Sequence, residues 1–325
     1  MAIIYKTYKD INCMKIIYDH FDHKYKINSG VVLTFGNFDG LHLGHELIIS
    51  TVKSIAVKRK LPSVILTFEP HPLVLFGKNN FKLINQKQKR ELISSCGVDY
   101  LYIIDFNESF SKINCSDFIT KILIDRCNTK HIVVGKSCTF GYNRFGNVLT
   151  LREYCKTGYS LTELEPLIIE GKICSSSLIR KYLQEGKTEI ANKLLGKPYQ
   201  VSGIVTKGAC RGREIGFPTI NIPIEDYMIK PKFGTYYAKA AFFDINLNCL
   251  YDGVANIGIR PTLKDLKKPI VEMHIFDFSE DVYGYKADVQ LLKFIRSEKR
   301  FHSIDELTKQ INCDVIKAYQ LRTNL

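Results

Sequence analysis

The sequence lacks any run of about 18 consecutive apolar residues, so no membrane-spanning helix and no membrane partner are expected. Residues 1–22 interleave charged and apolar side chains and show no signal-peptide core. The ten cysteines form no C-x-x-C pair, which argues against a zinc ribbon or a thioredoxin-type site. Their scattered spacing favours free thiols, most of them buried. We therefore expect a soluble, cytoplasmic protein without a disulfide framework.

Positive charge exceeds negative charge in this chain. Its 325 residues include 46 lysines and arginines against 33 aspartates and glutamates, a formal net charge of +13. Such an excess favours anionic partners: nucleic acid, an acidic membrane or phosphorylated small molecules. Residues 1–190 hold 26 basic and 18 acidic side chains and residues 191–325 hold 20 and 15, so the excess is spread out. The short clusters Lys58–Lys60 and Lys87–Arg90 are interpreted as solvated helix surfaces.

Four short apolar runs in the first half predict the strands of a parallel sheet. They alternate with helix-like stretches, and continuous β-rich runs of this kind are typical of a sheet covered on both faces. In such sheets, ligands bind beyond the carboxyl ends of the strands. The predicted strands are 31–35, 64–68, 100–105 and 131–135, and the predicted helices are 46–60, 87–96 and 117–127.

The second half has β-rich segments at close spacing, separated by Gly, Pro, Asp and Asn. This pattern predicts an antiparallel barrel or sandwich. A capping box at Ser303 predicts a final helix. The boundary is expected near 186–200, after a short helix over 178–185, which gives two domains, 1–186 and 191–325.

A ten-residue string, GNFDGLHLGH, follows the first predicted strand at residues 36–45. Glycines let the backbone approach a ligand closely, and the helix that follows offers N–H groups and a positive dipole end to phosphate. His42 and His45 are three residues apart, so both can face one phosphate and stabilise the charge that builds on it. Gly44 keeps side chains out of the space between them. On spacing alone, half of a metal site or two surface histidines are the alternatives.

Two further strings carry candidate ligands, one at the end of a predicted strand and one at a helix start. In FEPHP at 68–72, the two prolines fix a loop, and His71 is either a ligand or merely the cap of that loop. Ser175, Ser176 and Ser177 precede a helix, where serine caps the helix and binds phosphate through hydroxyl and backbone donors. Arg180 adds a fork of donors for a triphosphate. A plain helix cap with one surface arginine is the alternative.

The second half contains a pair of hard oxygen ligands. Three glycines punctuate a loop that ends in FPTIN at 217–221. Thr219 and Asn221 offer oxygens suited to Mg²⁺ with nucleotide phosphates. The alternative is a β-turn that uses Gly, Pro and Asn only for its shape.

A candidate base lies further along the chain, on the predicted strand 270–278. Alternation places Glu272 and His274 on one face with Phe276 and Phe278. A carboxylate there can accept a proton from an attacking hydroxyl. The alternative is a surface glutamate on a half-exposed strand.

Taken together, these strings resemble a known family over roughly residues 30–314. GNFDGLHLGH resembles the H-x-G-H motif of the nucleotidylyltransferase superfamily, and more narrowly the G-N-F-D-G-V-H-L-G-H of bacterial bifunctional riboflavin kinase/FAD synthetases. FEPHP, the GKSCTFGYNRFG loop at 135–146 and SSSLIR at 175–180 are similar to further family motifs in the same order. GFPTIN at 216–221 resembles the riboflavin kinase G-F-P-T-A-N motif.

The resemblance implies two domains and two reactions. A doubly wound parallel-sheet nucleotidylyltransferase domain would transfer AMP from ATP to FMN, giving FAD and pyrophosphate. An antiparallel β-barrel riboflavin kinase domain with a terminal helix would transfer the ATP γ-phosphate to riboflavin, giving FMN. Mg²⁺ would accompany ATP, flavins would be substrates and products, and FAD-requiring apoenzymes would be transient partners.

The resemblance also assigns residues to roles. The catalytic residues would be His42, His45, Arg180 and Glu272, the last as general base on the riboflavin 5′-hydroxyl, and the metal ligands would be Thr219 and Asn221. The ATP- or phosphate-binding residues would be Gly36, Asn37, Asp39, Gly44, Ser175, Ser176, Ser177, Gly208, Gly212, Gly216 and Pro218. The flavin-binding residues would be His71, Gly135, Phe140, Gly141, Asn256 and Arg296.

The 135–146 loop departs from the family pattern at two positions. Ser137 stands where an acid or amide is usual, and Cys138 stands where phenylalanine is usual. We expect FMN to bind weakly at the adenylylation site, with near-normal ATP binding. Two alternatives are an enzyme with only one active module and a basic nucleic-acid-binding protein with a small barrel. No aromatic-basic interleaving of an RNA-recognition motif is present, so we expect no nucleic acid partner.

Overall fold

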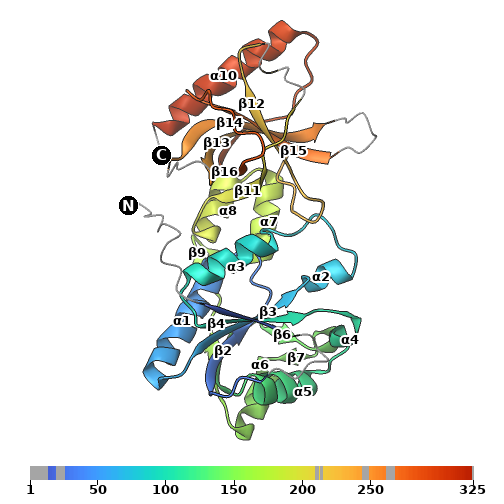
Figure 1. Cartoon of the computed structure of the whole chain (residues 1–325), viewed down its shortest axis with the longest axis vertical. Helices are drawn as coiled ribbons and strands as arrows, with labels where there is room; N and C mark the ends of the chain where they lie inside the picture. The colour runs from blue at the N-terminus through green and yellow to red at the C-terminus, as the bar shows by residue number, and fades with distance from the viewer. Residues whose placement is uncertain are drawn as a thin grey trace. The chain divides into compact units, whose positions relative to one another are not determined.

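The computed structural model describes residues 14–19, 26–208, 212, 215–243, 249–260 and 268–323. The chain divides into two compact units, Met1–Cys174 and Ser175–Leu325, and Figure 1 traces both. The described cysteines are free thiols, but among them only Cys127 and Cys174 are buried, so the expectation that most are buried was wrong. Cys13 and Cys210 lie outside the described residues.

The first unit is built on a parallel sheet. Its strands, within the described residues, run in the order β1-β4-β3-β2-β5-β8, and each neighbouring pair is parallel. The strands are β1 (Lys15–Asp19), β2 (Val31–Phe35), β3 (Ser63–Glu69), β4 (Tyr100–Asp105), β5 (Thr129–Gly135) and β8 (Ser160–Leu164). The four predicted strands are confirmed as its centre. The edge strands β1 and β8 were missed because edge strands are partly exposed and lack a continuous apolar run.

Helices connect these strands. They are α1 (Leu43–Arg59), α2 (Pro72–Leu75), α3 (Gln86–Ser95), α4 (Glu108–Ser111), α5 (Cys115–Asp117), the π-helical segment η1 (Phe118–Arg126) and α6 (Val148–Glu153), with short 3₁₀ turns at Tyr142–Arg144 and Tyr154–Thr157. Two small hairpins complete the unit: β6 (Thr139–Phe140) with β7 (Gly146–Asn147), and β9 (Ile168–Ile169) with β10 (Lys172–Ile173).

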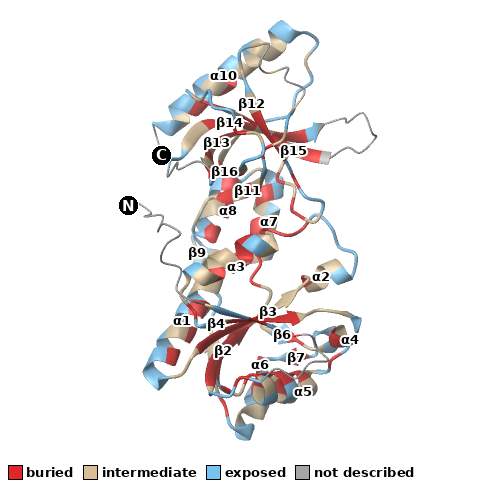
Figure 2. Ribbon diagram, viewed as in Figure 1, coloured by how far each residue is buried: buried red, intermediate tan, exposed pale blue. Residues whose placement is uncertain are grey.

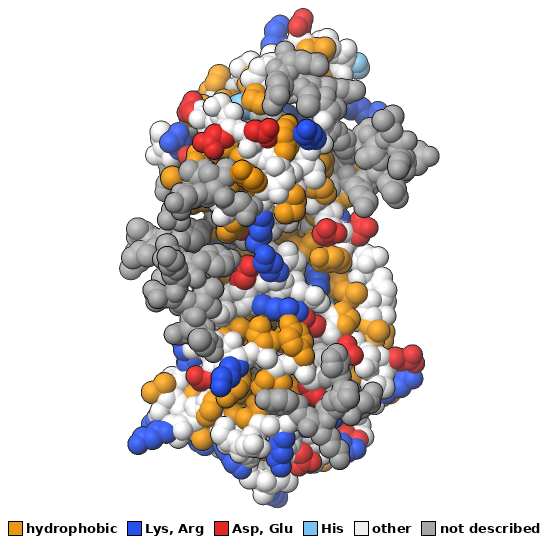
Figure 3. Space-filling model, viewed as in Figure 1, with side chains coloured by type: hydrophobic (Ala, Val, Ile, Leu, Met, Phe, Trp, Pro, Cys, Tyr) orange, Lys and Arg blue, Asp and Glu red, His pale blue; other side chains and the backbone are white. Residues whose placement is uncertain are grey.

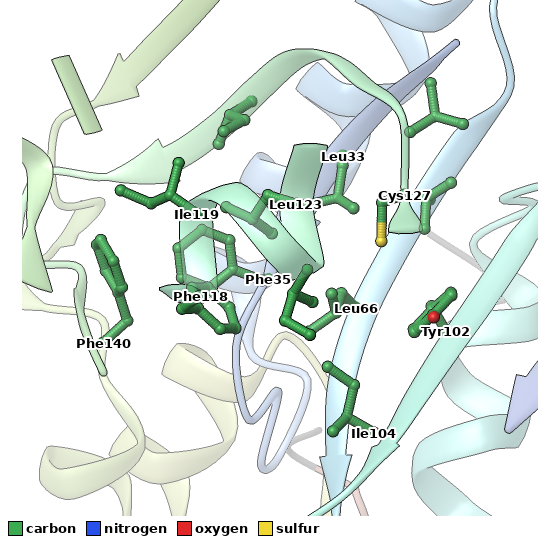
Figure 4. Close-up of a cluster of buried hydrophobic side chains, with 14 of the residues drawn as sticks. Leu33, Phe35, Leu66, Tyr102, Ile104, Phe118, Ile119, Leu123, Cys127 and Phe140 are labelled. Atoms are coloured by element: carbon green, nitrogen blue, oxygen red, sulfur yellow. The ribbon is translucent and has the colours of Figure 1, made fainter. Parts of the chain in front are cut away.

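Both faces of the sheet are buried, which explains its uninterrupted apolar strands. On one face, Leu33 and Phe35 of β2 pack with Phe118 and Leu123 of η1, as Figure 4 shows. On the other face, Val32 of the same strand packs against α1. Figure 2 shows this burial as the red colour of β2 and β3. Sheet and helices therefore form a core that holds the carboxyl ends of the strands in fixed positions.

The second unit combines helices with a curled antiparallel sheet. Its described strands run in the order β11-β16-β13-β14-β15-β12, and a bridge between Thr206 and Asn221 links the two edges. The elements are α7 (Ser176–Glu185), α8 (Thr188–Leu195), β11 (Tyr199–Ile204), β12 (Thr219–Pro223), β13 (Gly234–Phe242), β14 (Tyr251–Arg260), β15 (Lys268–Ile275), β16 (Lys286–Ser297) and α10 (Ile304–Arg322). The barrel prediction is confirmed, as is the final helix, which Ser303 caps.

One alternative and one local expectation for this unit were wrong. Thr219 and Asn221 lie on strand β12, so the alternative of a β-turn at these residues does not hold. β15 ends at Ile275, and Asp277 takes a left-handed conformation, so Phe276 and Phe278 do not continue the alternation of Glu272 and His274. Phe276 instead stacks on Tyr319 of α10.

Candidate active sites

The H-x-G-H string forms the start of α1, directly beyond β2. His42 is the N-cap, and the backbone N–H of His45 donates to His42 Nδ1 at 3.3 Å. The two imidazole rings stack with their centroids 3.7 Å apart. Because Nδ1 of His42 accepts a hydrogen bond, a neutral His42 carries its proton on Nε2. The structure therefore brings the two predicted histidines together at a helix N-terminus.

Gly44 lies between this pair and Cys174. A Cβ at position 44 would lie 3.2 Å from the His42 ring and 3.3 Å from the Cys174 carbonyl oxygen. The Gly44 N–H donates to Cys174 Sγ at 3.4 Å, and burial raises the pKa of this thiol. Glycine therefore leaves the His42 ring and the Cys174 carbonyl oxygen in place, whereas a Cβ at this position would require one of them to move.

Asn37 and Asp39 occupy the loop between β2 and α1 in different ways. The Asp39 carboxylate is buried and accepts hydrogen bonds from the backbone N–H groups of Leu83 (3.0 and 3.1 Å) and Ile84 (3.3 Å). These contacts tie two loops together. Asn37 Oδ1 is buried and has no hydrogen-bond partner among the described residues, so it is the stronger candidate for contact with a nucleotide.

Lys89 of α3 is buried, and its ammonium group lies at the end of β3, although the sequence suggested that this lysine is on a solvated surface. Lys89 is 7% exposed, and its Nζ donates to Thr67 Oγ1 at 3.1 Å and to the Phe68 carbonyl at 3.2 Å. Burial lowers the pKa of Lys89 to about 8. Arg90 pairs with Glu69. Lys89 and Arg90 therefore hold the end of β3, from which the 68–72 loop continues, whereas Lys87 is exposed as expected.

The predicted flavin residues of the first unit have mainly structural contacts. His71 caps α2, because its Nδ1 accepts the Leu73 N–H at 3.1 Å. Phe140 is buried against Phe35 and Phe118 in the core (Figure 4). Gly135 ends β5, and Gly141 has positive φ, with its missing Cβ only 2.9 Å from the Cys115 backbone nitrogen. These residues shape the loop, and direct flavin contact by them stays a prediction.

The serine string lies at the start of α7, in the second unit. Ser175 caps the helix by accepting the Leu178 N–H at 3.3 Å, as predicted. Ser176 and Arg180 follow within the first turns. Their grouping with the histidine pair stays a prediction.

A cavity of about 390 Å³ opens on the curled sheet of the second unit. Its walls include most of the predicted kinase residues, namely Gly208, Gly212, Pro218, Thr219, Asn221, Asn256, Glu272 and Arg296. Gly212 approaches Phe217 so closely that a Cβ would lie 2.3 Å from the Phe217 carbonyl oxygen. Gly216 has a φ of 85° and closes the same loop.

Five polar residues cross the sheet in one row. Asn221 on β12 pairs with Glu272 on β15, and Glu272 pairs with Asn256 on β14. Asn256 in turn pairs with Thr235 on β13, which pairs with Arg296 on β16. Directly paired residues point to the same face of a sheet, and all five line the cavity. This row is referred to below as the polar row.

The Asn221 end of the polar row carries oxygen atoms that suit a hard divalent cation. Asn221 is 3% exposed, and its Oδ1 has no hydrogen-bond partner among the described residues. Together with the Thr219 hydroxyl on the same face, it offers the oxygen chemistry that such cations prefer. No cluster of three or more His, Cys, Asp or Glu side chains that could hold a metal occurs within the described ranges.

Several lining residues were not assigned by sequence reasoning. His274 Nδ1 donates to the Pro218 carbonyl at 2.9 Å and so holds the loop before Thr219. Burial raises the pKa of Glu298, which lies against Gly258. Asp314 of α10 also lines the cavity and forms an ion pair with the predicted Arg296, with nitrogen–oxygen distances of 2.7 to 3.0 Å. Thr235 also lines the cavity, and it is recognised only from its cross-strand pairing with Asn256 and Arg296, which the sequence does not show.

Comparison with known proteins places these sites in a family. The model of the FAD synthetase family matches residues 24–178, and that of the riboflavin kinase family matches residues 195–322. These matches define a class of protein that joins a nucleotidylyltransferase domain to a flavokinase domain.

Full-length relatives narrow the class further. The chain is 38% identical over 299 residues to the bifunctional riboflavin kinase/FMN adenylyltransferase of Bacillus subtilis, covering 90% of this chain and 93% of the relative. It is 36% identical over 292 residues to the protein of that name in Escherichia coli, covering 89% and 92%. The chain belongs to the bifunctional riboflavin kinase/FMN adenylyltransferase family.

One solved structure shares the fold along nearly the whole chain. It is described as a macrolide-efflux protein from Streptococcus pneumoniae, with 29% identity and a TM-score of 0.80 over 92% of this chain and 97% of that chain. In the part of our chain that the structure describes, no helix is long and apolar enough to cross a membrane. On the face that Figure 3 shows, basic side chains lie among acidic and hydrophobic ones.

Proposed function

We propose that the second domain transfers the γ-phosphoryl group of ATP to the 5′-hydroxyl of riboflavin. The observation that carries this proposal is the polar row, in which Asn221 and Glu272 lie side by side on one cavity wall. A metal-ligating amide next to a carboxylate is what a phosphoryl transfer to a hydroxyl requires. In this proposal, Asn221 would help to hold the cation that neutralises phosphate charge, and the neighbouring Glu272 would remove the hydroxyl proton.

In this reaction Glu272 accepts the proton of the attacking hydroxyl. Thr219 and Asn221 would hold Mg²⁺, which neutralises phosphate charge when it is bound with ATP. His274 holds the loop that precedes Thr219 through its bond to Pro218. The hydroxyl oxygen forms the new bond to phosphorus as the bond to ADP breaks, so no covalent enzyme intermediate is needed.

We propose that the first domain transfers AMP from ATP to FMN. The stacked His42 and His45 lie at the N-terminus of α1, where phosphate is favoured. Nε2–H of His42 is a donor that can stabilise the charge that develops on the reacting phosphate. Arg180 and the serines before it would bind the leaving pyrophosphate, and Asn37 would contact the nucleotide.

The boundaries proposed for these domains are 1–186 and 191–325. The matched ranges of the two family models, 24–178 and 195–322, support a boundary between them. The compact units divide earlier, after Cys174, because α7 and α8 pack with the second unit. We propose a cytoplasmic location, delivery of FAD to apoenzymes and no nucleic acid partner, in keeping with small-molecule substrates.

The test is to incubate the purified chain with riboflavin, ATP and Mg²⁺ and to separate the flavins. The native chain should form both FMN and FAD. His45→Ala should lose about 10²–10³-fold in FMN adenylylation, as for one lost transition-state donor, and should still form FMN. Glu272→Gln should lose about 10²–10⁴-fold in FMN formation and should convert supplied FMN to FAD normally.

Each variant serves as the folding control for the other. If His45→Ala abolished both activities while the chain stayed folded, the assignment of two separate modules would be wrong. Native turnover of riboflavin by Glu272→Gln would refute the role of Glu272 as base. If the native chain formed FMN alone, only the kinase proposal would survive.

A further inference from the structure

Thr235 of β13 combines deep burial with a hydroxyl that lacks a visible partner. The residue is 2% exposed, and its Oγ1 forms no hydrogen bond with any described residue. Leaving a buried hydroxyl without a partner costs about 1–3 kcal/mol. A valine would fill the same volume without that cost. The position therefore calls for a polar partner other than the described residues.

The position of Thr235 in the sheet indicates that the missing hydrogen-bond partner is in the cavity. Its cross-strand neighbours are Asn256 and Arg296, and all three line the cavity. Thr188 gives a useful contrast. It is equally buried and its Oγ1 also has no described partner, but it lies on α8 and does not line this cavity. Of these two threonines, Thr235 is the one that lines a cavity large enough for a ligand.

The polar row also indicates which substrate contacts Thr235. Two buried oxygens without described partners, Asn221 Oδ1 and Thr235 Oγ1, lie on opposite sides of Glu272. The Asn221 side fits the cation and the phosphates of ATP. The flavin that presents its hydroxyl to Glu272 must therefore extend the other way, past Asn256 toward Thr235.

The spacing of the strands agrees with this direction. Thr235 is two strands from Glu272, which corresponds to about 10 Å across a sheet. An extended ribityl chain has about 5 Å between its terminal and its innermost hydroxyl oxygens, and a hydrogen bond of about 2.8 Å at each end covers the rest. We propose that Thr235 Oγ1 hydrogen-bonds a ribityl hydroxyl near the flavin ring and so contributes to selection of riboflavin. This inference rests on the proposed kinase reaction.

The experiment compares Thr235→Val with Thr235→Ser and with Thr188→Val. Riboflavin affinity is measured by quenching of flavin fluorescence, and the KM values for riboflavin and ATP are measured in FMN formation. Thr235→Val should weaken riboflavin binding about 3- to 10-fold, as expected for one neutral hydrogen bond, with the ATP KM unchanged. Thr235→Ser should stay within about twofold of the native chain, and Thr188→Val should leave riboflavin binding unchanged.

A second measurement separates recognition from a structural role. A riboflavin analogue without the 2′-hydroxyl should bind the native chain and Thr235→Val equally, because the bond is already absent. The midpoint of urea unfolding of free Thr235→Val should equal or exceed that of the native chain.

Three results would overturn the inference: unchanged riboflavin affinity in Thr235→Val, a change in the ATP KM instead, or lower stability that Thr235→Ser restores.

Fluorescence quenching measures flavin binding and does not require that the enzyme turn over. Failure of the kinase reaction would appear as flavin binding without FMN formation, and is thereby distinguished from failure of the Thr235 contact.

Discussion

Replacing Gly44 by alanine tests whether the stacked histidine pair is the centre of FMN adenylylation. The added Cβ would lie 3.2 Å from the His42 ring and 3.3 Å from the Cys174 carbonyl oxygen. Both distances are tighter than an ordinary van der Waals contact, so one neighbour has to move by a few tenths of an ångström. The carbonyl belongs to the backbone, whereas the His42 ring can rotate. We therefore expect the ring to move.

The magnitude follows from two opposing effects. Within a helix, alanine is favoured over glycine by about 1 kcal/mol, which roughly offsets the cap contact that α1 loses when the His42 ring moves away from the His45 N–H. Displacing a reacting group by about 1 Å can cost about 100-fold in rate, and a smaller shift costs less. We expect Gly44→Ala to lose about 10- to 100-fold in kcat/KM for FAD formation from FMN, or about 1.4–2.7 kcal/mol of transition-state stabilisation.

The assay measures both reactions and stability in the same preparation. FMN formation from riboflavin should be unchanged, because the kinase cavity lies in the second unit. Ser50→Ala is the matched control. Ser50 is an exposed residue of α1 whose hydroxyl bonds only to the Leu47 carbonyl among the described contacts. This control raises helix propensity without touching His42.

Native adenylylation by Gly44→Ala, with its stability unchanged, would refute the reasoning. It would mean that the His42 ring tolerates the new methyl group or that the ring takes no part in the reaction. A parallel loss of both activities with a lower midpoint of unfolding would instead show that the substitution damaged the fold.

Two further predictions concern the loop after β5 and the response to pH. Cys138 packs against the core of the first unit, and the Ser137→Asp/Cys138→Phe double variant should lower the FMN KM of FAD synthesis while the ATP KM stays constant; an unchanged or higher FMN KM in the folded variant would show that the loop has diverged with compensation. His131 is buried between Ser160 (2.7 Å) and Thr162 (2.8 Å), and burial lowers its pKa to about 4. Its stabilising contribution is therefore complete above the unfolded pKa of about 6.5 and is lost as the pH falls toward 4. Urea unfolding of the native chain and of His131→Gln at several pH values should show a shallower loss for the variant, and equal slopes would contradict this.

The sequence alone determined the local elements and the motifs. Buried parallel strands have to be apolar throughout because both faces are covered, and so β2 to β5 could be predicted from composition. Helix starts such as Ser175 and Ser303 were predictable because a cap depends on residues three positions apart. The string at 36–45 also predicted the paired histidines, since both lie within one turn of a single helix.

Only the tertiary structure decided which distant residues share a site. The polar row joins residues from 221 to 296 through the register of five strands, and register is set by pairing that no single segment encodes. Lys89 shows the same limit. It was expected on a solvated surface, yet it is buried and its Nζ donates to Thr67 and Phe68 at the end of β3. Burial depends on what packs above a residue, and that is fixed only when the whole sheet has formed.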